Sequence, residues 1–234
     1  MIKPALFNTE MVRAILEGKK TVTRRAVKQQ PSSSYELVSG MYRDGNGRLC
    51  AVFRSSEDIK SVYPNYDRGD ILWVRETWTK EAGEYFYRAD FDSDFLDPCE
   101  TLSGGYPHEC TYHPGCEGCM RGPQRIYWHP SIHMPREAAR IFLRVTGVRV
   151  ERLQEITESG AKAEGAVKSY PYTDPETGET AFMLDEKGTY LSGFSQIWDS
   201  TIKPKDLAAY GWDANPWVWV IEFERISMEE EYCG

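Results

Sequence analysis

The hydrophobic pattern of the first thirty residues predicts a short helix and then a strand. Apolar residues recur at helical spacing over residues 12–16, and Asn8 or Thr9 stands before them as a helix cap. Gly18 suits the left-handed position that often follows a helix. Residues 21–25 then alternate, so an extended chain turns both threonine hydroxyls to the same face. A helix is therefore expected to end, and a strand to begin, within a few residues of Gly18.

Further strands and helices follow at intervals along the chain. A turn at Gly69 and Asp70 precedes a segment in which residues alternate as in a strand. A long β-branched segment predicts a second strand, with a bend at Gly147. The last apolar segment alternates as a half-buried strand does. Thr157 can cap a short helix. DGNG at 44–47 is typical of a hairpin turn. The predicted strands cover 71–76, 139–153 and 217–224, and the predicted helices cover 157–165 and 190–200.

Several strands separated by turns, with two or three short helices, indicate an α+β domain built around a small barrel and not a doubly wound sheet. No glycine-rich phosphate loop follows a predicted strand, and this excludes the common nucleotide-binding folds from the candidate fold classes. Three polar, turn-rich stretches interrupt the regular pattern and read as insertions in a single domain of residues 1–234. The insertions cover about 30–67, 80–127 and 168–188.

Composition and charge narrow the functional classes. The chain has 234 residues, of which 41% are hydrophobic, so it can bury a core. It contains no apolar run of signal-peptide or membrane-spanning length, and we expect a cytoplasmic protein without a membrane partner. A net charge of -8 argues against a protein that coats duplex nucleic acid. Residues 1–30 nevertheless hold seven cations against two acids, which suits a local anion-binding site.

Four stretches of the chain, taken in order, carry a resemblance. They are ILEGKKTVTRR (15–25), RGDILWVRETW (68–78), PSIHMPREAARIFLRVTGVRVERLQEITESGAKAEG (130–165), and IWDS (197–200) followed by NPWVWVIEFERI (215–226). Together they resemble the ASCH domain, a branch of the PUA-like barrel superfamily, and in detail its bacteriophage and prophage versions. The resemblance implies a PUA-like small β-barrel with flanking short helices, in a protein of phage origin that acts in the cytoplasm of a bacterial host cell.

The same resemblance implies a site. The family hallmark is a GxKxxxxR-like segment beside a cleft in the barrel, and Gly18, Lys20 and Arg25 fit it. The family is associated with RNA binding, and one bacterial branch is similar to amidohydrolases that remove the acetyl group from N4-acetylcytidine. In that branch a lysine, a threonine three residues later and a glutamate from a later helix form the catalytic set. Lys20, Thr23 and Glu164 match these three positions.

These residue types suit amide hydrolysis under one condition. Threonine is unreactive at its free pKa, and Lys20 can serve as its base only when neutral. Burial and the neighbouring cations Arg24 and Arg25 push the pKa of Lys20 in that direction, and the same cations can stabilise an oxyanion. Glu164 then orients the lysine or relays a proton. Alternatively, Glu164 pairs with Lys20, keeps it charged and leaves Thr23 inert, and the sequence does not choose between these outcomes.

Further residues in the resembling stretches are candidates for ligand binding. Tryptophans can stack on a nucleobase, although such residues are more often part of a core. A single histidine is as often a hydrogen-bonded structural group as a cleft residue, and cations after a helix also suit its dipole. The candidates are Arg24, Arg25, Trp73, Arg75, Trp78, Ser131 and His133, with Trp128 as a further aromatic residue.

Two principal functions follow from these residues. The first is an amidohydrolase that cleaves a non-peptide C–N bond in N4-acetylcytidine or a related modified nucleoside, and it needs no organic cofactor. The second is a non-catalytic module that binds RNA or a modified base in the same cleft, and a ribonuclease is a third reading. The acidic net charge favours a small ligand over a long RNA.

A cluster of cysteines predicts a structural zinc site in the second insertion. Thiols stay reduced in the cytoplasm, and CEGC at 116–119 is a knuckle of the kind that binds Zn²⁺. Ligand softness favours four cysteines, while His108 or His113 remains an alternative to a cysteine, and free thiols in a loop are the simpler reading. Cys50 and Cys233 stand apart. The predicted ligands are Cys99, Cys110, Cys116 and Cys119.

The zinc prediction is tested by metal analysis of the purified protein. We expect zinc in the wild type and its loss in Cys116→Ser, because a tetrahedral site that lacks one thiolate holds the ion poorly. Wild-type protein that is free of metal would contradict the prediction.

Overall fold

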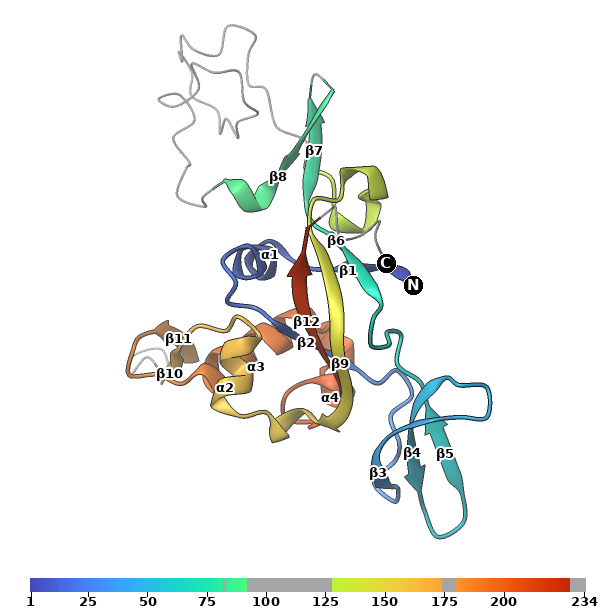
Figure 1. Ribbon diagram of the computed structural model, residues 1–234. Helices are drawn as coiled ribbons and strands as arrows, with labels where there is room; N and C mark the ends of the chain where they lie inside the picture. Colours follow the sequence, from blue (N-terminus) through green and yellow to red (C-terminus); the bar gives the residue numbers. More distant parts are fainter. Residues whose placement is uncertain (82, 92–127, 174–179, 228–234) are drawn as a thin grey trace, which may run out of the picture.

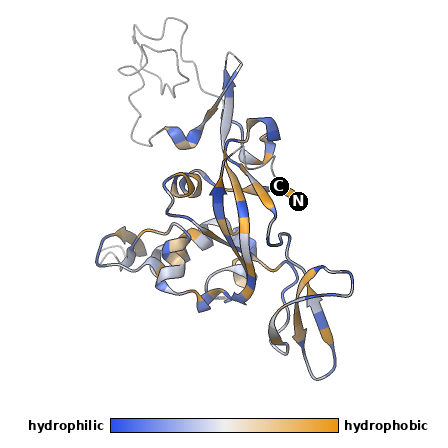
Figure 2. Cartoon of the chain, in the orientation of Figure 1, coloured by the Kyte–Doolittle hydropathy of each residue, from blue (hydrophilic) through white to orange (hydrophobic). Residues whose placement is uncertain are grey.

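The computed structural model describes residues 1–81, 83–91, 128–173 and 180–227. Its centre is a five-stranded sheet in the order β1-β6-β9-β12-β2, in which β1 and β6 are parallel and the other neighbours are antiparallel (Figure 1). Figure 2 shows apolar residues along α1 and the central strands, interleaved with polar ones. The strands are β1 (Ile2–Leu6), β6 (Ile71–Arg75), β9 (Phe142–Arg152), β12 (Trp217–Ile226) and β2 (Val22–Ala26).

Strand β12 of the central sheet is buried on both faces, which corrects the expectation of a half-buried strand. Trp219 and Ile221 belong to a core that also contains Phe7 and residues of α1, whereas Val218 and Val220 belong to a second core with α2 and α3. Both faces are covered because the chain packs separate elements against each side of the sheet. The pattern of residues 217–221 is therefore continuously buried.

The mixed α+β class is confirmed, and the expected closed barrel is not found. Within the described residues the sheet has two open edges, β1 and β2, and no strand pairing joins them. Arg25 on β2 donates a hydrogen bond to the carbonyl of Leu6 on β1 at 2.6 Å. A side chain thus bridges the two edges where a barrel would have a backbone ladder.

The helices begin and end where local signals predict. Asn8 caps α1 by accepting a hydrogen bond from the Met11 amide at 2.8 Å, and Thr157 caps α2 through the Gly160 amide at 3.1 Å. The helices are α1 (Thr9–Leu16), α2 (Glu158–Ala163), α3 (Tyr190–Thr201) and α4 (Leu207–Tyr210), with short 3-10 turns η1 (Arg88–Asp90), η2 (Ser131–His133), η3 (Arg136–Ala138), η4 (Leu153–Glu155) and η5 (Pro204–Asp206). No helix among these described elements is long and apolar enough to cross a membrane.

The first predicted insertion contributes to the main core instead of standing apart from it. Its three strands form a separate sheet, and Ala51, Phe53 and Val62 pack in the same core as α1. The turn expected at 44–47 joins β3 to β4. The strands outside the central sheet are β3 (Glu36–Arg43), β4 (Leu49–Arg54), β5 (Ile59–Val62), β7 (Trp78–Glu81), β8 (Glu84–Tyr87), β10 (Ser169–Thr173) and β11 (Thr180–Leu184).

The long strand β9 is irregular near the predicted bend. Gly147 lies opposite Glu222, while Val145 lies opposite the next residue, Phe223, so the register shifts by one residue at Thr146. A Cβ on Gly147 would lie 2.8 Å from a carboxylate oxygen of Glu222. Glycine at this position thus leaves room for the side chain that crosses over it.

Asp70 fastens the parallel pair at the edge of the central sheet. Its carboxylate accepts hydrogen bonds from Lys3 Nζ at 2.7 Å, from the amino group of Met1 at 2.9 Å and from the Asp67 amide at 2.8 Å. Burial raises the pKa of the Asp70 carboxyl, but these hydrogen bonds outweigh burial, and the pKa lies below its ordinary value. An aspartate with a lowered pKa adds stability above about pH 4, and this stability is lost as the pH falls through the folded-state pKa.

We expect Asp70→Asn to lower the free energy of unfolding by about 2 kcal/mol near neutral pH, because the ammonium of Lys3 loses a charged acceptor. The difference from wild type should shrink below about pH 4, where the wild-type carboxyl becomes protonated. Urea denaturation across the acidic range measures both effects. Asp213→Asn at an exposed position is the matched control, and a loss that does not change with pH would contradict this role of Asp70.

Candidate functional site

The site begins at the turn that ends α1. Gly18 adopts a left-handed backbone with φ of 71°, and the amides of Lys19 and Lys20 both donate to the carbonyl of Ala14, at 2.8 and 2.9 Å. This turn points the two lysines in different directions. The side chain of Lys19 is 71% exposed, whereas that of Lys20 has no exposed surface. Local backbone geometry thus selects which lysine enters the interior.

The end of α2 lies directly against this turn. Lys20 forms an isolated antiparallel bridge with Glu164, and the Thr21 amide donates to the carbonyl of Ala163 at 2.9 Å. Gly165 follows with φ of 83°, and a Cβ there would lie 2.8 Å from the Cβ of Ala14. Glycine at this position therefore permits the two helix ends to approach closely.

Four charged residues form what we call the buried ion cluster: Lys20, Arg24, Glu151 and Glu164. Lys20 Nζ lies 2.5 Å from Glu164 Oε2, and it also donates to the Glu164 carbonyl at 2.8 Å. Glu164 Oε1 accepts a hydrogen bond from Arg24 Nη1 at 3.2 Å, and Arg24 Nη2 donates to Glu151 at 2.7 Å. The cluster connects the end of α1, β2, β9 and the end of α2.

Burial and pairing act in opposite directions on Lys20. Burial lowers the pKa of Lys20, the carboxylate of Glu164 raises it, and the cations of Arg25 and Arg24 lower it further. The net result is a pKa below the ordinary value of lysine. The structure therefore has features of both alternatives left open by the sequence. Glu164 pairs with Lys20, whereas burial and the nearby arginines favour the neutral amine of Lys20.

Thr23 is buried near the cluster but is not bonded to it. It lies on β2 opposite Ile221, so its side chain faces the core that contains Phe7 and α1. Its hydroxyl makes no hydrogen bond with any residue in the described part of the chain. The structure thus brings together two of the three predicted catalytic residues and leaves the hydroxyl of the third without a partner among the residues described.

Arg25 occupies the same face of β2 as Thr23. Its guanidinium lies 5.2 Å from the centre of the Phe7 ring, and Lys20 Nζ lies 6.0 Å from the same ring. Arg25 also lines a cavity of about 250 Å³ together with Trp219. Arg24 faces the opposite side and is fully engaged with carboxylates, so of these two predicted ligand-binding arginines only Arg25 borders a cavity among those described.

The remaining predicted ligand residues form a second group on β6, at the start of β7 and in the Ser131–His133 turn, and Arg75 connects β6 to this turn. Its guanidinium lies 5.3 Å from the Trp73 ring and donates to the carbonyl of Ile132, within the Ser131–His133 turn. Trp78 stacks on His129 with ring centres 4.8 Å apart. The indole nitrogen of Trp78 and the Nε of Arg75 are buried without a hydrogen-bond partner among the described residues.

Phe7 links the two groups and was not predicted. Its amide donates to the carbonyl of Arg75 at 3.1 Å, while its ring contacts Lys20 and Arg25. A local signal for Phe7 exists, since it precedes the helix cap and shares a core with Val12, as in a hydrophobic staple. This residue therefore could have been found from the sequence.

Two other charged groups had no usable sequence signal. Glu151 reaches Arg24 from another strand, and Glu76 is buried against Arg140 through hydrogen bonds of 2.9 and 3.0 Å. Burial raises the pKa of Glu76, and Arg140 opposes this effect without cancelling it. Each pair joins segments that are distant in the chain, which periodicity cannot reveal.

The predicted zinc ligands lie outside the described residues, as do His108 and His113. The described part of the chain contains no group of three or more metal-ligating side chains. The zinc site therefore stays a prediction of the sequence.

Trp128, the further aromatic candidate, contacts Phe91, with ring centres 5.6 Å apart.

The chain was compared with models of protein families, with curated proteins and with solved structures, and none of the three comparisons finds a match. The residues of the site and their geometry are therefore the basis for assigning a function.

A double-mutant cycle tests the buried ion cluster. We expect Lys20→Met and Glu164→Gln each to lower the free energy of unfolding by about 3 kcal/mol, because each removes the charged contact between Lys20 and Glu164 from a buried site. The double variant should lose clearly less than the sum of the two, since either single variant already removes this contact.

Chemical denaturation measures all four proteins of the cycle. Lys19→Met is the matched control and should change stability by no more than about 0.5 kcal/mol, because Lys19 is exposed. Additive losses in the cycle would show that Lys20 and Glu164 do not interact.

Proposed function

We propose that this chain is an ASCH-type hydrolase whose buried ion cluster serves removal of an acyl group from an acylated nucleoside, such as N4-acetylcytidine. The single observation that carries the proposal is the lysine at position 20. Its ammonium is buried, lies 2.5 Å from Glu164, and has a lowered pKa. A buried lysine with a perturbed pKa and a specific charge partner is typical of functional sites.

The strand-rich α+β architecture and the GxKxxxxR-like segment support the family assignment. Gly18 makes the turn, Lys20 enters the interior and Arg25 borders a cavity, as a cleft residue should. Membership of the PUA-like superfamily remains part of this proposal, although the described residues form an open sheet and not a closed barrel.

The proposed reaction uses the three residues in distinct roles. Neutral Lys20 accepts the proton of the Thr23 hydroxyl, and the threonine oxygen forms a bond to the carbonyl carbon of the amide. Arg25, on the same face of β2, stabilises the resulting oxyanion. The C–N bond then breaks, and protonated Lys20 returns its proton to the departing amine. Water hydrolyses the acyl-threonine, which releases the carboxylic acid and restores the hydroxyl.

In this scheme Glu164 is a positioning residue. Its two oxygens hold Lys20 and Arg24, so the amine of Lys20 has one defined location. The same contacts favour a second candidate function, in which Lys20 stays protonated and the site binds RNA or a modified base without cleaving it. The two functions differ in whether Lys20 ever loses its proton.

Release of cytidine from N4-acetylcytidine is the direct test. We expect turnover by the wild type and a loss of at least about 100-fold in kcat/KM for Lys20→Met and for Thr23→Val, because each removes a group that moves a proton or forms a bond. Lys19→Met is the control and should keep wild-type turnover. Activity should rise with pH and level off below the ordinary pKa of lysine, since the base acts in its neutral form and burial lowers its pKa.

Two results would reject the enzymatic proposal. One is the absence of turnover by the wild type together with salt-sensitive RNA binding, which supports the binding module instead. The other is wild-type turnover in Thr23→Val and Lys20→Met, which places any hydrolysis elsewhere.

A further inference from the structure

One cavity in the described part of the chain is lined by cations and by no acidic residue. It measures about 250 Å³ and lies between β2, the end of β5 and Trp219 of β12. Arg25 and Lys28 are the only charged residues among those that line it. Because the whole chain has a net charge of -8, a lining that holds only positive charge is a property of this place and not of the composition.

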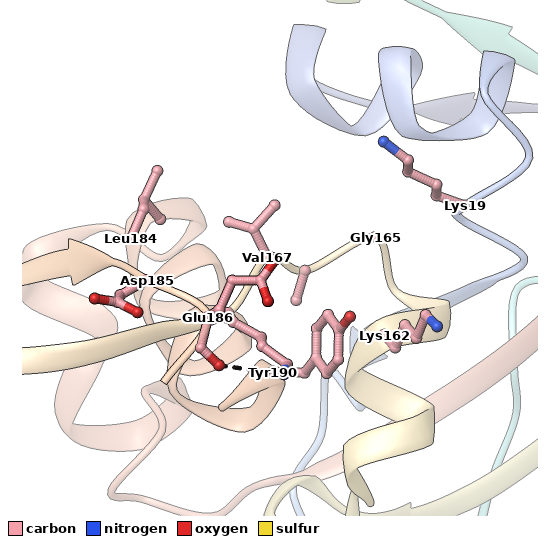
Figure 3. A pocket seen from close by; sticks show the side chains of 10 residues that line it. Lys19, Lys162, Gly165, Val167, Leu184, Asp185, Glu186 and Tyr190 are labelled. Carbon is pink, nitrogen blue, oxygen red and sulfur yellow. Dashed lines mark hydrogen bonds between the residues drawn. The ribbon is translucent and has the colours of Figure 1, made fainter. Parts of the chain in front are cut away.

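Two other cavities of the described chain carry both signs of charge. A hollow of about 490 Å³ beside α2 contains Lys19 together with Asp185 and Glu186 (Figure 3). A further one of about 500 Å³ contains Glu36 as well as Arg54. Carboxylates in these two linings repel an anion, so the smaller cavity is better suited to bind a negative charge.

The guanidinium of Arg25 is a cation without a carboxylate partner among the described residues. Its one hydrogen bond within that part of the chain goes to the carbonyl of Leu6 at 2.6 Å, which leaves further N–H groups available. Burial lowers the pKa of Arg25 below its ordinary value, and Tyr66 and Glu164 oppose this effect without cancelling it. A bound anion offsets the free-energy cost of holding such a charge away from water.

The wall opposite β2 supplies neutral hydrogen-bond donors. The hydroxyl of Ser61 and the side-chain amide of Asn65 border the cavity and form no hydrogen bond with any described residue. This wall is held against β1, because the Tyr66 hydroxyl donates to the carbonyl of Pro4 at 2.9 Å. Lys3 Nζ donates to the carbonyl of Asn65, also at 2.9 Å. The donors are therefore fixed relative to the edge of the central sheet.

Apolar side chains complete the lining of the same cavity. Val27, Val62 and Trp219 are buried and border it. An anion that carries an apolar group therefore fits this lining better than inorganic phosphate, which is polar on every side. The volume lies below the range of about 300 to 1,000 Å³ that is usual for drug-sized ligands, so the ligand has few atoms.

We propose that this cavity binds a short-chain carboxylate, such as acetate or propionate, through Arg25. The planar guanidinium donates two parallel hydrogen bonds to the carboxylate, Ser61 and Asn65 donate to the same oxygens, and the alkyl group contacts the apolar lining. Binding of the carboxylate does not require the proposed reaction. The acid released in that reaction belongs to the same chemical class, so inhibition by this product is a consequence that rests on the proposed function.

Titration with acetate, followed by NMR of the acetate methyl group, tests the proposal on the full chain. We expect the neutral analogue acetamide to bind at least about tenfold more weakly than acetate, because it lacks the charge that Arg25 pairs with. Arg25→Lys should weaken acetate binding about tenfold, since lysine lacks the planar fork of donors. Arg54→Met, at an exposed position elsewhere, is the control and should bind acetate as the wild type does.

Two variants of the opposite wall keep the test decisive if Arg25→Lys does not fold. Ser61→Ala and Asn65→Ala change exposed side chains, so each should fold normally and weaken acetate binding about threefold through one lost hydrogen bond. Thermal unfolding of every variant shows whether weaker binding is a loss of folding.

Three results would overturn the proposal. They are equal affinity for acetate and acetamide, full affinity for acetate in a folded Arg25→Lys or in both alanine variants, and tighter binding of inorganic phosphate than of propionate.

Inhibition by acetate distinguishes this proposal from the catalytic one. Added acetate should slow the release of cytidine from N4-acetylcytidine by the wild type, and about threefold more acetate should be needed for Ser61→Ala. Acetate binding without any turnover supports the carboxylate site and rejects the reaction. Turnover without acetate binding rejects the carboxylate site and leaves the reaction in place.

Discussion

The carboxylate of Glu164 is the interaction on which the arrangement of the site depends. It is nearly closed to water and accepts hydrogen bonds from both Lys20 and Arg24. A charge removed from water is tolerated only with a well-placed partner, so these three side chains constrain one another. Because they come from the turn after α1, from β2 and from the end of α2, their pairing sets how the helix ends meet the sheet edge. Gly18 and Gly165 supply the backbone turns that the pairing requires.

The side chains of β2 alternate between the two cores that lie on opposite faces of the central sheet. Arg24 faces the core of α2 and α3, where it pairs with carboxylates, whereas Thr23 and Arg25 face the core that contains Phe7. Alternation along a strand is a simple property of an extended chain. Here it separates Arg24, whose charge is paired with carboxylates, from the next residue, Arg25, which borders a cavity.

The same geometry allows two roles for Lys20. Burial penalises its charged form and the nearby carboxylate favours it, so the energetic difference between protonation states is smaller than for a lysine in water. A group in this condition can exchange a proton during a reaction or hold one as part of a stable pair. The comparison of stability with turnover in the same variants separates these roles, because a structural pair affects unfolding alone.

Local features of the chain were determined by the sequence itself. The Asn8 and Thr157 caps, the left-handed turn at Gly18 and the hairpin turn at 44–47 depend on interactions within a few residues, and all were predicted. The proximity of Lys20 to Glu164 was expected only through a family resemblance, because 144 positions separate them. The open sheet, the burial of both faces of β12 and the recruitment of Glu151 were decided by tertiary structure. Periodicity records which face a side chain takes, but not which distant segment packs against that face, and that choice depends on the whole chain.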